Sequence, residues 1–132
     1  MKYLLILTLF IINSCGDKKQ QKEDVSQNPT EIKAIKEILN AQKECWNNGD
    51  IDGFMEGYWN SEELIFTSLN HKPAFGWENT LERYKNSYPT KESMGNFNFE
   101  ILELKLISDK SARLKGKWEL IRKDDNPNGL FW

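Results

Sequence analysis

Two consecutive segments with alternating apolar residues, 96–108 and 112–120, restrict the fold of this chain more than any other feature. In the second segment, apolar or small residues alternate with charged ones at Ala112, Leu114, Gly116, Trp118 and Leu120. This period of two is typical of a strand with one buried face in an antiparallel sheet. Because the polar turn 108–111 joins the two segments, they predict one long antiparallel hairpin.

The first of these segments changes its buried face part of the way along. Its apolar residues are Phe97, Phe99 and Ile101, followed by Leu102, Leu104 and Leu106. A strand changes its buried face only where one extra residue enters the ladder. The sequence therefore predicts a β-bulge near Ile101–Leu102.

Three helices are predicted before this hairpin. Asn28 and Pro29 begin the first helix, and the segment Asn47-Asn48-Gly49 ends it. Its buried stripe is Ile32, Ile35, Leu39, Gln42 and Trp46. Asp50 begins the second helix, whose apolar stripe is Ile51, Phe54, Met55 and Tyr58. The third helix carries Trp77, Leu81, Tyr84 and Tyr88, and Pro89 stops it.

Short strands complete the predicted layout. Residues 64–68 and 74–75 have strand composition and are separated by a predicted turn at 70–73. Residues 124–129 predict another turn, and Leu130 begins a further strand. Helices followed by an antiparallel sheet predict an α+β fold, in which we expect the bulged sheet to wrap around the third helix.

The amino-terminal segment has the pattern of an export signal. Residues 4–12 form an apolar run that is too short to cross a bilayer as a helix. Ile12-Asn13-Ser14-Cys15 resembles the lipobox of bacterial lipoproteins, which implies cleavage before Cys15 and lipid attachment to it. We expect a signal peptide at 1–14, a flexible tether at 15–28 and a folded domain at 29–132, held by lipid at the bacterial cell envelope and facing the periplasm or the exterior. The alternative is an ordinary signal peptide with a cysteine nearby.

Several classes of function find no support in the composition. The formal net charge of −2 gives no electrostatic reason to expect nucleic acid as a partner. The chain has one His and, beside Cys15, only Cys45, so no metal-ligand cluster of familiar spacing and no intramolecular disulfide is expected. We interpret Cys45 as a small hydrophobic residue of the first helix. No phosphate-binding loop or nucleophile motif is present, and no cofactor is predicted.

The order of these elements and several motifs resemble a known family. The motifs are Trp46-Asn47-Asn48-Gly49-Asp50, Phe54-Met55-Glu56-Gly57-Tyr58-Trp59, Leu64-Ile65-Phe66, Gly76-Trp77, Arg83-Tyr84-Lys85, Tyr88-Pro89, Met94-Gly95 and Gly116-Lys117-Trp118. Together they resemble the SnoaL-like branch of the nuclear transport factor 2-like superfamily over residues 29 to 132. The resemblance implies a cone-shaped barrel, with the helices packed on a curved antiparallel sheet. Since such domains end with two long strands, it also implies that the C-terminal strands are missing from this sequence.

The same resemblance implies a cavity between the helices and the concave face of the sheet. We expect six aromatic residues to line a ligand cavity there: Tyr58, Trp59, Trp77, Tyr84, Tyr88 and Trp118. The predicted function is binding of a small apolar or amphipathic molecule, by a homodimer formed through the sheet. No catalytic residue is assigned, because the segment 67–71, where steroid-isomerising members carry their base, has no carboxylate. We expect His71 to be solvated in its turn. The alternative is a polyketide-cyclase-like or isomerase-like enzyme that uses Tyr and a residue of the missing strands.

Overall fold

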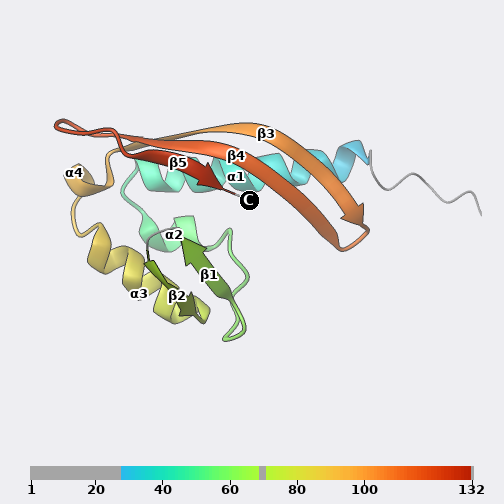
Figure 1. Ribbon diagram of the computed structural model, residues 1–132, viewed down its shortest axis with the longest axis horizontal. Helices are drawn as coiled ribbons and strands as arrows, with labels where there is room; N and C mark the ends of the chain where they lie inside the picture. The colour runs from blue at the N-terminus through green and yellow to red at the C-terminus, as the bar shows by residue number, and fades with distance from the viewer. Residues whose placement is uncertain (1–27, 69–70, 132) are drawn as a thin grey trace, which may run out of the picture.

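The computed structural model describes residues 28–68 and 71–131 (Figure 1). The helices are α1 (Pro29–Asn47), α2 (Ile51–Met55), α3 (Trp77–Ser87) and α4 (Lys91–Met94). The strands are β1 (Ile65–Ser68), β2 (His71–Phe75), β3 (Asn96–Ser108), β4 (Ser111–Ile121) and β5 (Asn128–Phe131). The predicted signal peptide 1–14, the lipidation site Cys15 and the tether 15–28, apart from Asn28, lie outside the described residues.

The strands form two separate antiparallel sheets, one of β1 and β2 and one with the order β3-β4-β5. Figure 1 shows the longer sheet as a curved layer along α1, with α3 and the short sheet on the other side of α2. The predicted α+β order of helices and antiparallel sheet is confirmed. Within the described residues the sheets stay open and do not close into a barrel.

The predicted bulge is present in β3. Ile101 pairs with Gly116 and Glu103 pairs with Lys115, so Leu102 has no partner residue on β4. Leu102 is exposed, whereas Leu106 beyond the bulge is buried. Because of the extra residue, even-numbered residues beyond the bulge lie on the face that odd-numbered residues occupy before it, as the change in the apolar pattern predicted.

The first and third helices agree with the prediction, and the second is shorter. The Asn28 side chain caps α1 by accepting a hydrogen bond from the Thr30 backbone N–H at 3.1 Å. Gly49 follows α1 with φ 80°, a conformation that glycine adopts at little cost. The helix α2 ends at Met55, so Tyr58 lies beyond the helix on which it was predicted. Gly53 and Gly57 both lower the helix propensity of this segment.

Three short features differ from the prediction. Residues 71–73 belong to β2 and not to a turn, because Ser68 and His71 are already paired. Pro73 is tolerated there since a two-stranded sheet consists only of edge strands. The strand β5 begins at Asn128, two residues before the predicted start at Leu130. The helix α4 was not predicted, and a capping box between Thr90 and Ser93 holds its single turn.

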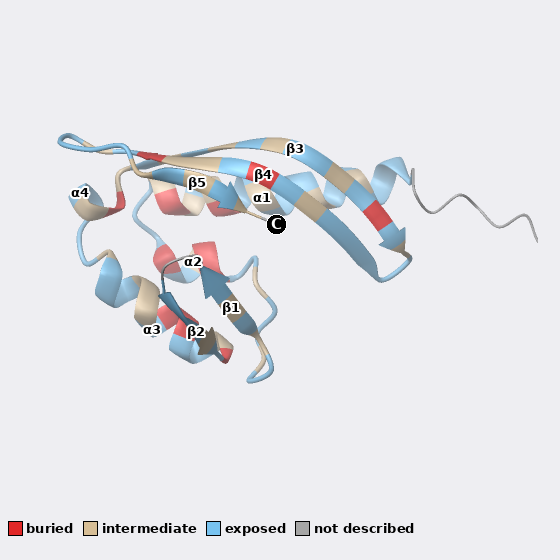
Figure 2. Ribbon diagram, in the orientation of Figure 1, coloured by how far each residue is buried: buried red, intermediate tan, exposed pale blue. Residues whose placement is uncertain are grey.

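The core lies between α1, α2 and α3, and Met94 of α4 and Leu120 of the long sheet complete it (Figure 2). Its buried residues are Trp46, Ile51, Phe54, Met55, Leu81, Met94 and Leu120. We expected the sheet to wrap around the third helix, but α1 packs on β3 while α3 packs on α2 and β2. The Asn47 side chain contributes to this α1–β3 contact, because it bonds to both the N–H and the C=O of Phe97. None of the described helices combines the length and the apolar character needed to span a membrane.

Candidate ligand site

Seven aromatic rings from five segments of the chain form one group, which we call the aromatic cluster. Its members are Trp46, Phe54, Tyr58, Phe66, Tyr84, Tyr88 and Phe97. Neighbouring ring centroids lie between 4.9 Å (Trp46–Tyr88) and 6.5 Å (Phe54–Phe97) apart. Most pairs meet edge to face, which is the arrangement that ring quadrupoles favour. The helices and both sheets thus contribute to a single aromatic surface.

The aromatic cluster is only partly buried. Trp46 and Phe54 belong to the core, at 3% and 7% exposure. The other five rings are half-buried: Tyr58, Phe66, Tyr84, Tyr88 and Phe97. These five rings keep some accessible apolar surface beside the core.

Two of the tyrosines interact through their hydroxyl groups. Burial raises the pKa of Tyr84 well above its ordinary value, and the neighbouring Tyr58 hydroxyl raises the same pKa further. Burial also raises the pKa of Tyr58, although its hydrogen bond with Tyr84 opposes that shift. Both side chains are therefore neutral phenols at physiological pH and can donate or accept one hydrogen bond each.

The three tryptophans predicted to line the cavity have different positions. Trp77 packs on the core, and its indole Nε1–H donates to the Met55 backbone oxygen at 3.0 Å. Trp118 packs on the core from β4, where it pairs with Phe99 on one side and Gly129 on the other. Trp59 is 62% exposed and takes part in none of the contacts of the aromatic cluster among the described residues. The structure thus brings Tyr58, Tyr84 and Tyr88 together and leaves Trp59 outside.

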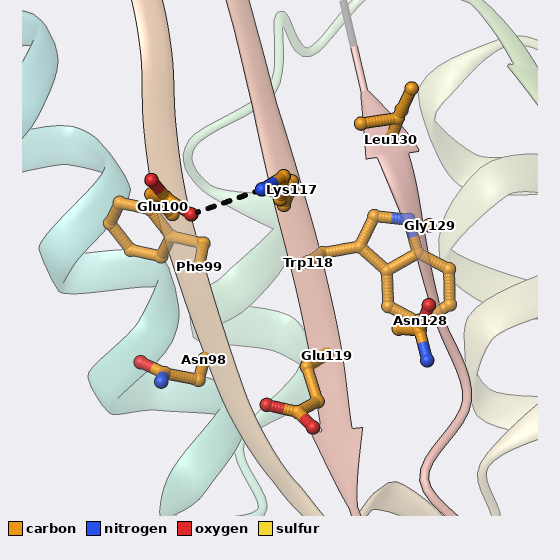
Figure 3. Close-up of a pocket in the computed structure, with 9 residues that line it drawn as sticks. All are labelled: Asn98, Phe99, Glu100, Lys117, Trp118, Glu119, Asn128, Gly129 and Leu130. Atoms are coloured by element: carbon orange, nitrogen blue, oxygen red, sulfur yellow. Dashed lines mark ion pairs between the residues drawn. The ribbon is translucent and has the colours of Figure 1, made fainter.

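A pocket of about 450 Å³ lies on the long sheet (Figure 3). Three consecutive residues from each strand line it: Asn98, Phe99, Glu100, Lys117, Trp118, Glu119, Asn128, Gly129 and Leu130. Because side chains alternate along a strand, Phe99, Trp118 and Gly129 lie on one face and the remaining six on the other. Glu100 and Lys117 form an exposed ion pair at 3.6 Å. Of the six predicted cavity residues, this pocket includes only Trp118.

A second pocket of about 360 Å³ lies at the start of α3. Its lining residues are Asn60, Ser61, Glu62, Phe75, Gly76, Trp77, Glu78 and Asn79. Trp77 is its only predicted member. The predicted cavity residues are therefore distributed over the aromatic cluster and two separate pockets.

The sequence predicted the burial of Gln42 but not its hydrogen bond, and it did not predict the burial of Thr80. Gln42 is buried and its Nε2 donates to the Phe54 backbone oxygen at 3.0 Å. Thr80 is fully buried and its hydroxyl donates to the Gly76 backbone oxygen at 2.8 Å. The signal for Gln42 was available, because it is the one polar residue on the predicted apolar stripe of the first helix. Gln42 thus holds the backbone at Phe54 of the aromatic cluster, and Thr80 satisfies a backbone oxygen at the start of α3.

The arrangement offers apolar surface and phenol donors. The aromatic cluster itself contains no carboxylate or imidazole, and His71 is exposed on β2. The pKa of the Cys45 thiol is raised by burial and then by Asp50, so the reactive thiolate is disfavoured. In the part of the chain that the structure describes, no group of His, Cys, Asp and Glu is placed to hold a metal ion. These features suit the binding of an apolar molecule.

Comparison with known proteins gives structural matches only. No protein-family model matches the sequence, and no curated protein does. A crystal structure of an NTF-2-like protein of unknown function from Shewanella oneidensis MR-1 is 43% identical to this chain. The match has a TM-score of 0.72 and covers 76% of this chain and 82% of that one.

Two more distant structures share the fold alone. One is a domain of unknown function with a cystatin-like fold from Nostoc punctiforme PCC 73102, at 14% identity and a TM-score of 0.64. That match covers 78% of this chain and 62% of the other. The other is an LEH-like epoxide hydrolase of M. tuberculosis, at 11% identity and a TM-score of 0.51, with coverage of 74% and 68%. Because of its identity to the Shewanella protein over most of both chains, this chain belongs to the family of NTF-2-like proteins.

Proposed function

We propose that this protein is a lipid-anchored binding protein of the bacterial cell envelope, whose NTF-2-like domain holds a small apolar or amphipathic molecule against the aromatic cluster. The observation that carries the proposal is the half-buried state of four rings that form one connected series, Tyr58, Phe66, Tyr84 and Tyr88, together with Phe97, which joins them through Trp46 and Phe54. Ligand sites are mostly apolar and aromatic, with a few placed polar groups. The hydroxyls of Tyr58 and Tyr84 supply such groups for the polar end of an amphipathic ligand.

Binding is proposed in preference to catalysis because of the chemistry of the aromatic cluster. Its phenols can donate hydrogen bonds, but their raised pKa values make them poor bases at physiological pH. The fold shared with an epoxide hydrolase does not alter this preference, since that likeness is one of architecture at 11% identity.

The proposed location of the protein in the cell rests on its amino-terminal sequence. The apolar run 4–12 followed by Ser14-Cys15 supports export and lipid attachment at Cys15. We also propose a homodimer formed through the long sheet, on whose surface opposite charges pair, as between Glu103 and Arg113 at 2.9 Å. Mixed charges on one face are compatible with a self-complementary contact around a twofold axis.

Native mass spectrometry of the full chain in lipid nanodiscs tests the binding proposal. We expect a bound species of small-molecule mass that persists in Trp59→Ala and is lost or reduced in Tyr84→Ala, with folding of both variants checked by circular dichroism. Trp59 is the matched control because it is exposed and outside the aromatic cluster. Equal retention of the species in both variants would show that it binds elsewhere.

A further inference from the structure

Arg83 differs from the other two arginines of the chain in its lack of a charged partner. Arg113 pairs with Glu103 at 2.9 Å, and Arg122 pairs with Asp125 at 2.6 Å. Among the described residues, Arg83 takes part in none of the ion pairs. The molecule therefore holds one half-buried guanidinium whose positive charge is not neutralised by a neighbouring carboxylate.

The contacts of Arg83 are with uncharged oxygen atoms of β1 and β2. Its Nη1 donates to the Lys72 backbone oxygen at 2.9 Å, and its Nη2 donates to the Ser68 hydroxyl at 3.3 Å. A guanidinium has more N–H donors than these two contacts use. The positions three and four residues away on α3, where helical neighbours lie, are also uncharged: Asn79, Thr80, Asn86 and Ser87. Donors of Arg83 thus remain for another partner.

The guanidinium of Arg83 lies directly beside the aromatic cluster. Its Cζ atom is 5.9 Å from the centroid of the Phe66 ring, within the range of a cation–π contact. The Phe66 ring in turn lies 5.6 Å from Tyr84 and 6.0 Å from Tyr58. Arg83 also acts on the Tyr84 phenol, because its charge opposes the rise in pKa that burial of Tyr84 causes. The positive charge is therefore placed next to the half-buried rings.

We infer that Arg83 binds the head group of the ligand, so that the site takes amphiphiles with an apolar body and an anionic head, either a carboxylate or a phosphate. This inference rests on the proposed function and names the class of ligand. A guanidinium pairs with either anion through two parallel hydrogen bonds, which are stronger than those between neutral groups. The apolar body gains from burial against Phe66 and the rings beyond it. An uncharged head group would lack the first of these gains.

Three probes with the same alkyl chain isolate the contribution of the head group. Decanoate, decyl phosphate and n-decanol are titrated into the full chain in phosphatidylcholine nanodiscs at about pH 8, where a carboxyl group is ionised. Protein-free nanodiscs of the same lipid are the blank. Arg83 also joins α3 to β1 and β2, so a substitution that moves these strands would move Phe66 and weaken all three probes alike. Only the loss of a charge contact weakens the anions selectively.

Two substitutions remove the charge of Arg83 in different ways. Arg83→Gln keeps N–H donors near Ser68, and Arg83→Met keeps the aliphatic stem that packs beside Phe66. Lys85→Gln is the matched control, because Lys85 is the other basic residue of α3 and its charge is already paired with Asp52 at 2.7 Å. Thermal melting identifies any variant that fails to fold.

Selective binding of an anionic probe is the expected result. The unaltered chain should bind decanoate or decyl phosphate about tenfold more tightly than decanol, equivalent to about 1.4 kcal/mol, and the tighter of the two identifies the head group. Both Arg83 variants should lose this preference and change the affinity for decanol less than about twofold. Lys85→Gln should keep the preference. If neither Arg83 variant folds, the comparison of the probes on the unaltered chain decides.

Three results would overturn the inference and leave the proposed function intact. They are equal binding of decanol and both anions by the unaltered chain, equal weakening of all three probes in the Arg83 variants, and a preference for anions that survives in both of these variants. Failure of the unaltered chain to bind any of the probes would overturn the proposed function as well.

Discussion

At the scale of single residues, Asn47 links parts of the chain that are 50 positions apart. Its Oδ1 accepts a hydrogen bond from the Phe97 N–H at 2.6 Å, and its Nδ2 donates to the Phe97 oxygen at 3.1 Å. The side-chain amide thus pairs with β3 as a neighbouring strand would. This contact fixes the end of α1 against the edge of the long sheet, directly beside Trp46 of the aromatic cluster.

Asn47→Ala should destabilise the protein by about 1–3 kcal/mol, because it leaves two half-buried backbone groups of Phe97 without their partner. Urea denaturation followed by circular dichroism measures the change. Asn48→Ala is the control, since Asn48 is exposed and only its backbone takes part in the cap. If Asn47→Ala lowers the free energy of unfolding no more than Asn48→Ala does, solvent replaces the Asn47 amide without loss of stability.

The raised pKa of Tyr84 predicts that the protein loses stability at high pH. Below the ordinary tyrosine pKa of about 10, the phenol is neutral in both the folded and the unfolded state, and its contribution is fully present. Because burial raises the pKa in the folded state, the unfolded state ionises first as the pH rises above this value. The free energy of unfolding should therefore fall as the pH rises above about 10, and should fall less in Tyr84→Phe. Identical slopes in the two proteins would contradict the raised pKa.

At the scale of elements, the bulge at Leu102 determines which face of β3 is buried. Leu102 is exposed and has no partner on β4, so its side chain contributes little to packing. Its backbone, however, adds the one residue that places Leu104 and Leu106 on the buried face of the strand. The position is therefore tolerant of substitution, whereas one further residue inserted beyond the bulge would exchange the faces again.

Insertion of one glycine between Leu104 and Lys105 should destabilise the protein by about 2–5 kcal/mol, the cost of removing one large apolar side chain from a core, because it turns Leu106 outward. Leu102→Thr should stay within about 0.5 kcal/mol of the unaltered chain, as surface substitutions do. Thermal denaturation compares the two. Equal melting temperatures would mean that the hairpin shifts its register without cost.

The elements also show what the sequence can and cannot predict. The bulge, the ends of α1 and the stop of α3 were predicted, since each depends on residues adjacent in the chain. The helix α4 was not, because four residues are too few to show a helical period. The meeting of Tyr58, Tyr84 and Phe66 depends on the packing of three elements, which local patterns do not encode. For the same reason the outward position of Trp59 was not predicted, although its neighbour Tyr58 is packed.

At the scale of the whole molecule, the aromatic cluster is the part shared by both sheets and the helices. Phe66 of the short sheet contacts Tyr84 of α3, while Phe97 of the long sheet contacts Trp46 of α1. A ligand on this surface would touch all layers at once. The proposed anchor at Cys15 would place the surface near a membrane, where apolar molecules concentrate.

Cys15→Ala should move the protein from the membrane fraction to the soluble fraction of bacterial cells, because it removes the thiol to which lipid is added. Fractionation followed by immunoblotting measures this, with Cys45→Ala as the control that leaves the signal sequence unaltered. Retention of Cys15→Ala in the membrane fraction would contradict lipid anchoring at this residue.

We propose above all that the half-buried rings of the aromatic cluster are a ligand-binding surface. Nuclear magnetic resonance of the full chain with ¹³C-labelled tyrosine and ¹⁵N-labelled tryptophan tests it, with 1-aminoanthracene as the probe. We expect the ring signals of Tyr58, Tyr84 and Tyr88 to shift in a saturable way, while the indole N–H signal of the exposed Trp59 stays in place. Unchanged tyrosine signals at saturating probe, or a shift confined to Trp59, would contradict it.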